Sequence, residues 1–194
     1  EISAYHEAGH ALVSELLPYA DPVHKISLIS RGEALGYTWN LPEEERFVET
    51  KSKFKDKLAT LLAGRAAEEL VFQDASTGAE NDLREATKIA REMVVNYGMS
   101  EKIGPVVLGE REELVFLGKE LAEHKVISER MASAVDAEIK RIIEEAYERA
   151  KEILERHRKA LEAIAKKLLR KEELSRKQFL AILRKFGVRS AHLK

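Results

Sequence analysis

The stretch that most limits the fold lies at the start of the chain, in the run AYHEAGHALVSEL over residues 4–16. His6 and His10 are four positions apart, so on a helix their side chains lie on one face, one turn from each other. The other residues of this run are mostly apolar and cover the helix nearly all round, which is typical of a buried helix. Burying two imidazoles and a carboxylate there is costly unless they bind a metal ion or pair with other groups.

The pattern H-E-x-x-H, formed by His6, Glu7 and His10, is typical of the metal-binding helix of zincin peptidases. Two imidazoles one helical turn apart can both bind one tetrahedral zinc ion. Glu7 is turned by about 100° from His6 around the helix, so it borders the open side of the metal and can accept a proton from water. We therefore predict Zn²⁺ as the cofactor, with two histidine ligands and Glu7 as the catalytic base. The chain has no cysteine, so all its metal ligands must be nitrogen or oxygen atoms.

A catalytic zinc site needs a third protein ligand, and two places in the sequence compete for that role. One is Glu68 or Glu69 in the run GRAAEEL, where both residues flank the apolar face of a predicted helix. The other is Asp82 in TGAENDL, which lies in phase with the apolar stripe of its own helix. An aspartate on a core-facing side needs a partner, which could be a metal cation, an arginine side chain or a backbone amide. Residue spacing leaves these possibilities open.

The apolar periodicity predicts a mainly α fold with a small β-hairpin or sheet. Predicted helices cover residues 3–17, 52–72, 76–100 and 174–187, and residues 128–169 form one long helix or two in succession. Strands over 23–32 and 34–42 form the hairpin through Gly32, and 104–110 is a candidate short strand. Capping boxes are expected at Thr77 with Glu80 and at Ser175 with Gln178, while Gly98 and Gly187 mark helix ends. Residues 110–127 are charged and irregular, as expected of a loop.

We predict one metallopeptidase domain over residues 1–194, with a zinc-site lobe at 1–109 and C-terminal helices at 128–187. The composition, 44% hydrophobic and 35% charged, is that of a soluble globular domain. No apolar run approaches the roughly 18 residues of a membrane-spanning helix, so we expect no direct membrane insertion. Residues 151–194 hold 14 Lys and Arg against 5 Asp and Glu, which we interpret as a solvated basic face. It lacks interleaved aromatic residues, so we do not expect a nucleic-acid partner.

Several runs spread in order over nearly the whole chain resemble the peptidase domain of the FtsH family. They include YHEAGHALV, ALGYTWNLPEEE, LLAGRAAEELVF and STGAENDLREATKIAREMV. Members of that family are membrane-anchored, ATP-dependent zinc metalloproteases. The resemblance implies that His6 and His10 are zinc ligands, that Glu7 is the base and that Asp82 is the third ligand. It leaves Glu68 and Glu69 as supporting residues.

The resemblance also implies a longer parent protein with N-terminal membrane helices and an AAA+ ATPase module. The chain has no G-x-x-x-x-G-K-[ST] phosphate loop, so we expect ATP to be used by that module and not by this chain. The implied partners are unfolded polypeptide substrates, five further copies in a homohexamer and the AAA+ module of the same parent chain. The implied location of the parent is the cytoplasmic face of the bacterial inner membrane.

These patterns predict a zinc endopeptidase domain that degrades unfolded or misassembled proteins for its ATP-dependent parent. The substrate is expected to add in extended form to an exposed strand edge at Ile26–Ser30. One alternative is a stand-alone zincin that cleaves small peptides and uses Glu68 or Glu69 as a ligand. A second alternative is a non-catalytic module that forms a hexamer and uses zinc only to stabilise its fold.

Overall fold

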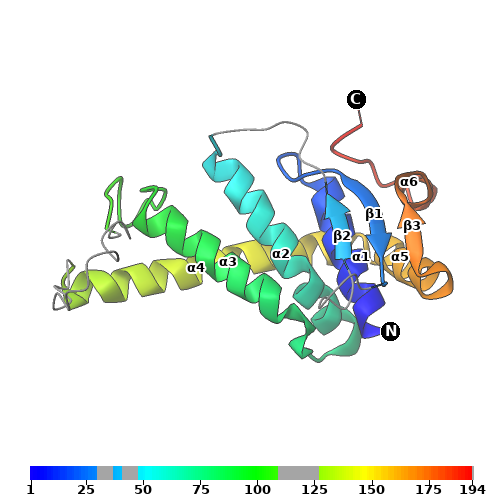
Figure 1. The fold of residues 1–194 in the computed structure, drawn as a ribbon, viewed down its shortest axis with the longest axis horizontal. Helices are drawn as coiled ribbons and strands as arrows, with labels where there is room; N and C mark the ends of the chain where they lie inside the picture. Colours follow the sequence, from blue (N-terminus) through cyan, green and yellow to red (C-terminus); the bar gives the residue numbers. More distant parts are fainter. Residues whose placement is uncertain (30–36, 41–47, 109–126, 194) are drawn as a thin grey trace, which may run out of the picture.

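The computed structural model describes four stretches of the chain, residues 1–29, 37–40, 48–108 and 127–193. Helices dominate it, with one small sheet at their side (Figure 1). In chain order the elements are α1 Ile2–Leu16, β1 Val23–Ser27, β2 Tyr37–Asn40, α2 Lys51–Phe72, the 3₁₀ turn η1 Thr77–Ala79, α3 Glu80–Val95, α4 Glu129–Arg156, α5 Arg158–Lys171, β3 Glu173–Ser175 and α6 Arg176–Lys185. The predicted fold class is confirmed, whereas the division into lobes at 1–109 and 128–187 stays a prediction.

The sheet has the order β2-β1-β3, and β1 is antiparallel to both neighbours. The predicted pairing of the first two strands is confirmed, and its turn at Gly32 lies outside the described residues. Ile26 faces Thr38 on one side and Leu174 on the other. The prediction of a free edge at Ile26–Ser30 is therefore wrong for Ile26 and Ser27, because β3 occupies the side expected to be open. Ser30 itself lies outside the described residues.

Helix α1 is buried at the centre of one apolar core, where it packs against α2 and α5. Small residues line the contact between α1 and α2, so the two backbones approach closely. A side-chain carbon added at Gly9 of α1 would lie 2.6 Å from the carbonyl oxygen of Ala63 and 2.8 Å from Cβ of Ala67. This close packing places the α1 side chains directly against the backbone of α2.

A second apolar core joins α2, α3 and α4. Leu58 and Leu62 of α2 pack there with Ile89 and Met93 of α3, and the α4 face that includes Ile142 closes the cluster. As a result α2 lies between α1 and α3, and α3 is held with its first turn near α1 (Figure 1). Helices α2 and α4 contribute residues to both cores, and α2 separates α1 from α3.

Three local features differ from the sequence predictions. The expected capping box at Thr77 and Glu80 is wrong, because the Ser76 hydroxyl caps the 3₁₀ turn by accepting from the Gly78 amide at 3.1 Å. Residues 104–108, the described part of the candidate strand at 104–110, are irregular. Helix α3 ends at Val95, a few residues before the predicted end at Gly98. Most of the predicted loop at 110–127 lies outside the described residues.

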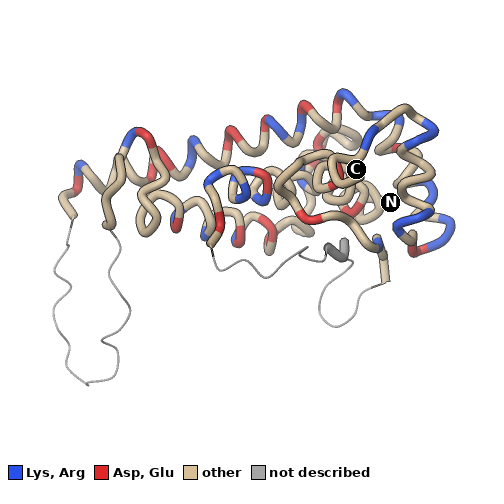
Figure 2. The backbone as a smooth tube through the Cα atoms, turned by 90° about the horizontal axis from the view of Figure 1, so that it is seen from above, with Lys and Arg blue, Asp and Glu red and all other residues tan. Residues whose placement is uncertain are grey.

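Other boundaries agree with the predictions. The long helical stretch after residue 128 consists of two successive helices separated at His157, which agrees with the second of the two predicted possibilities. The capping box of Ser175 and Gln178 is present at the start of α6, and Gly187 follows that helix with a φ of +69°. Lys and Arg predominate at the end of the molecule formed by α5 and α6 (Figure 2). Among the described residues, no helix is both long and apolar enough to cross a membrane.

A buried ion pair anchors the last turn of α1 to the C-terminal elements. Glu15 has no exposed side-chain surface, and its two carboxylate oxygens accept from the Arg176 guanidinium at 3.0 and 3.1 Å. The same carboxylate also accepts from the Val23 amide of β1 and the Ser190 hydroxyl. One side chain therefore holds α1, β1, α6 and the final residues together.

We predict that Arg176→Ala lowers the free energy of unfolding by about 3 kcal/mol, because it leaves the Glu15 carboxylate buried without its cation. Urea denaturation of the 194-residue chain measures this change. The exposed neighbour Lys177 provides the control, since Lys177→Ala should stay within about 0.5 kcal/mol of the unsubstituted protein. Equal effects of the two substitutions would contradict the role given to the ion pair.

Candidate metal centre

His6 and His10 lie one turn apart on α1, and both are almost fully buried. Their ring centroids are 4.6 Å apart in an edge-to-face arrangement, and their Nε2 atoms are 3.0 Å apart. The helical spacing thus brings together two ring nitrogens, as the sequence predicted.

The other nitrogen of each ring is bound to α2. His6 Nδ1 donates to the carboxylate of Glu68 at 2.7 Å, and His10 Nδ1 donates to the main-chain carbonyl of Thr60 at 2.7 Å. Because both partners are acceptors, the Nδ1 atoms carry the protons and each Nε2 is left to bind elsewhere. Glu68 is itself fixed, since its second oxygen accepts from the Ser76 amide at 2.8 Å.

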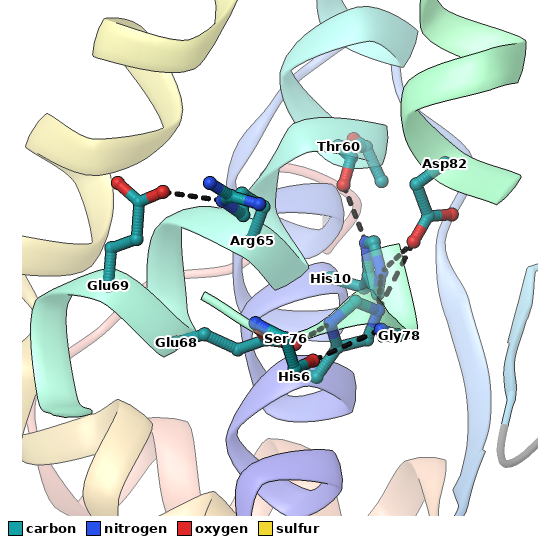
Figure 3. Close-up of polar contacts among 9 residues, drawn as sticks. All are labelled: His6, His10, Thr60, Arg65, Glu68, Glu69, Ser76, Gly78 and Asp82. Carbon is teal, nitrogen blue, oxygen red and sulfur yellow. Dashed lines mark hydrogen bonds and ion pairs between the residues drawn. The ribbon is translucent and has the colours of Figure 1, made fainter. Parts of the chain in front are cut away.

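Asp82, in the first turn of α3, closes the group from the opposite side. Its Oδ2 lies 3.2 Å from His6 Nε2 and 3.3 Å from His10 Nε2 (Figure 3). Three atoms that bind one zinc ion tetrahedrally at 2.0–2.1 Å are about 3.3 Å from one another. The three observed separations, 3.0 to 3.3 Å, match this value, so the donor atoms fit a zinc ion in both kind and spacing.

The electrostatics of the three residues also favour a cation between them. Burial acts to lower the pKa of His10, but the hydrogen bond and the charge of Asp82 outweigh it and raise the pKa to about 9. Burial acts in the opposite direction on Asp82, where the hydrogen bonds and charges of the two histidines prevail and lower its pKa. Without a metal, the site therefore holds a proton at neutral pH where a divalent ion would supply the positive charge.

The structure separates the two glutamates that the sequence left as competitors. Glu69 accepts from Arg65 and from the Tyr147 hydroxyl, and it points away from the histidines (Figure 3). The Tyr147 hydrogen bond is the largest cause of the lowered pKa of Glu69. Glu68 contacts only His6, at Nδ1, whereas Asp82 lies at the Nε2 atoms of both rings. The three atoms that converge belong to His6, His10 and Asp82.

Glu7 follows His6 on α1, and its side chain is buried with it in the same region. The structure thus brings His6, His10 and Asp82 together and places Glu7 next to His6 on the same helix. Sequence reasoning missed the Thr60 carbonyl and the Ser76 amide. Both are main-chain groups and carry no side-chain signal, although Thr60 and Glu68 are eight positions apart and so share a helix face.

The chain is similar to a known protein family and to several of its members. The model of Peptidase family M41 matches residues 1–182 of the chain. The chain is 54% identical to ATP-dependent zinc metalloprotease FtsH 1 of Thermomicrobium roseum, over 89% of this chain and 26% of that protein. It is 51% identical to the FtsH protease of Thermotoga maritima, over 94% of this chain and 30% of that protein. It is 46% identical to the FtsH protease of Rubrobacter xylanophilus, over 97% of this chain and 29% of that protein. The chain spans less than a third of the length of these curated relatives.

The raised pKa of His10 predicts how the metal-free protein responds to pH. A histidine whose folded pKa of about 9 exceeds its ordinary value of 6.5 adds stability that is complete below pH 6.5 and is lost as the pH rises through 9. Asp82→Asn should lower the pKa of His10 by about 1 to 3, because it removes the opposing charge. Imidazole ¹⁵N resonances recorded after chelator treatment report this pKa directly.

The exposed Asp136 of α4 offers a matched control, since Asp136→Asn makes the same chemical change far from the histidines. The pKa of His10 should be the same in that variant as in the unsubstituted protein. If His10 titrated near 6.5 in the metal-free protein, the coupling between these two residues would be refuted.

Proposed function

Since the chain belongs to peptidase family M41, we propose that it is the zinc-dependent endopeptidase domain of an ATP-dependent, membrane-anchored protease. The resemblance to FtsH proteases is confirmed by relatives of that name that are 54% and 51% identical to this chain. The family is one of zinc metallopeptidases. The observation that carries the proposal is the convergence of His6 Nε2, His10 Nε2 and Asp82 Oδ2, with both histidines buried and Asp82 partly exposed.

These three atoms would hold the zinc ion, and Glu68 and the Thr60 carbonyl would keep the two rings oriented from behind. When bound, zinc supplies a Lewis acid that polarises the scissile carbonyl and makes water a better nucleophile near neutral pH. Glu7 acts as the base, taking a proton from the attacking water. It then passes that proton to the amide nitrogen that leaves, which is ordinary general acid–base chemistry for a glutamate.

The proposed substrate is an unfolded polypeptide that binds in extended form through its main chain. Among the described strands β1 is paired on both sides and β2 and β3 are the edges, so we place such pairing at the outer side of β2, the edge strand that contacts α1. Main-chain recognition depends little on side chains, so it would give the broad specificity that a degradative protease requires.

The remaining parts of the proposal concern the parent protein. We infer an AAA+ module that uses ATP to unfold substrates, a homohexameric assembly and anchoring at the cytoplasmic face of the bacterial inner membrane. The support is the family resemblance, together with relatives that are named ATP-dependent and are more than three times as long as this chain.

We predict that Glu7→Gln lowers casein hydrolysis by at least about a hundredfold, because the amide cannot accept the proton from water. Zinc content should stay at the level of the unsubstituted protein, since Glu7 is not one of the converging ligands. Glu69→Gln, a matched change on the far side of α2, should keep its activity. Hydrolysis that survives Glu7→Gln, or that resists a chelator, would remove this residue or the metal from the mechanism.

A second prediction separates ligands from supporting residues. Asp82→Asn should abolish stoichiometric zinc binding, whereas Glu68→Gln should weaken it by about 10- to 100-fold and Glu69→Gln should leave it unchanged. Zinc content by mass spectrometry and titration against a coloured chelator measure these effects. The ligand assignment fails if Glu68→Gln loses zinc as completely as Asp82→Asn does, which would instead favour the stand-alone zincin alternative.

A further inference from the structure

Three positions of α2 form one stripe facing the histidine pair. Residues 60, 64 and 68 are four apart, so they share a helix face. The first provides the carbonyl that accepts from His10, and the third provides the carboxylate that accepts from His6. Between them lies Gly64, which has no side chain to offer a contact.

The space over Gly64 is filled by the two imidazole rings. A side-chain carbon added there would lie 2.5 Å from His6 Cε1, 2.7 Å from His6 Nδ1 and 2.6 Å from His10 Nε2. Heavy atoms in favourable contact are about 3.5–4.0 Å apart. Both rings therefore rest directly on the α2 backbone at the one position of the stripe where a side chain is absent.

Neither backbone conformation nor helix stability explains a glycine at this position. Gly64 lies in the interior of α2 and is not among the described residues with a positive φ. Glycine in a helix interior is less favourable than alanine, so the residue weakens the helix that carries it. The remaining explanation for a glycine at position 64 is the space that it leaves for the imidazole rings of His6 and His10.

The rings cannot move aside without losing their partners. Each Nδ1 is 2.7 Å from its acceptor on α2, and each Nε2 is within 3.3 Å of Asp82 Oδ2. Helix α1 is also pressed against α2 at Gly9. We propose that Gly64 is a positioning residue of the metal centre, whose missing side chain lets both imidazoles reach their acceptors and direct Nε2 at the metal. This inference rests on the proposed zinc site.

The test uses Gly64→Ala in the 194-residue chain and measures zinc affinity by competition with a chelator. We expect at least a tenfold loss of affinity, comparable to the loss of a group that orients a zinc-bound histidine. The visible spectrum of the Co²⁺-substituted protein should also change, because it reports the ligand geometry independently of activity. Gly187→Ala is the control, since it strains a glycine at a φ of +69° with nothing within 4 Å of the added carbon. That variant should lose thermal stability and keep its zinc affinity and its Co²⁺ spectrum.

A second measurement, on metal-free protein, covers the case in which Gly64→Ala folds poorly. The same substitution is placed in a background where His6 and His10 are both replaced by Ala, which removes all three close contacts. We expect Gly64→Ala to lower the thermal midpoint of the chain that retains its histidines and to raise it in the background without imidazoles, where only the better helix propensity remains.

Each outcome bears on one claim. Unchanged zinc affinity in Gly64→Ala, or the same effect on the thermal midpoint in both backgrounds, overturns the role of Gly64 and leaves the proposed function intact. Failure of the unsubstituted chain to bind zinc at all overturns the proposed function itself.

Discussion

The structure depends on the close contact between α1 and α2. Small residues on both helices, Gly9 and Ala63 among them, let the two backbones approach until side chains of one helix touch main-chain atoms of the other. This contact allows the carbonyl of Thr60 to accept from His10 Nδ1. A wider separation would keep the helices and the core but would leave the imidazoles without fixed tautomers. The packing distance between two helices therefore sets the chemistry of the site.

The second requirement is that α3 brings a carboxylate to the same point. Its apolar face packs with α2 and α4, and this packing fixes the first turn, where Asp82 lies, against the histidine pair. The lowered pKa of Asp82 and the raised pKa of His10 both follow from that placement. Two separate cores thus meet at the metal centre, one holding the nitrogen donors and the other holding the oxygen donor.

Side-chain types and spacing in the sequence indicated the residues that lie together at this centre, but they carried no information about its main-chain contacts. His6, Glu7 and His10 can be recognised from their residue types and spacing, and Asp82 is in phase with the apolar stripe of its own helix. The sequence gives no such signal for the Thr60 carbonyl, because every residue has a main-chain carbonyl. The strand β3 was also missed, because three residues between two helices show no alternation and their pairing with β1 is fixed by distant packing.

The anchoring of Glu15 by Arg176 and Ser190 has a consequence for the order in which the protein matures. The contacts of this carboxylate join positions 161 and 175 residues apart, so the helix that carries the histidines is held at its end by segments that are synthesised much later than the helix itself. During translation, that helix would leave the ribosome long before its anchors do. Contacts of such long range form late in folding because the intervening chain must first be closed into a loop. In a nascent chain, the helix that carries the histidines would then be fixed at its end only after Ser190 had been released.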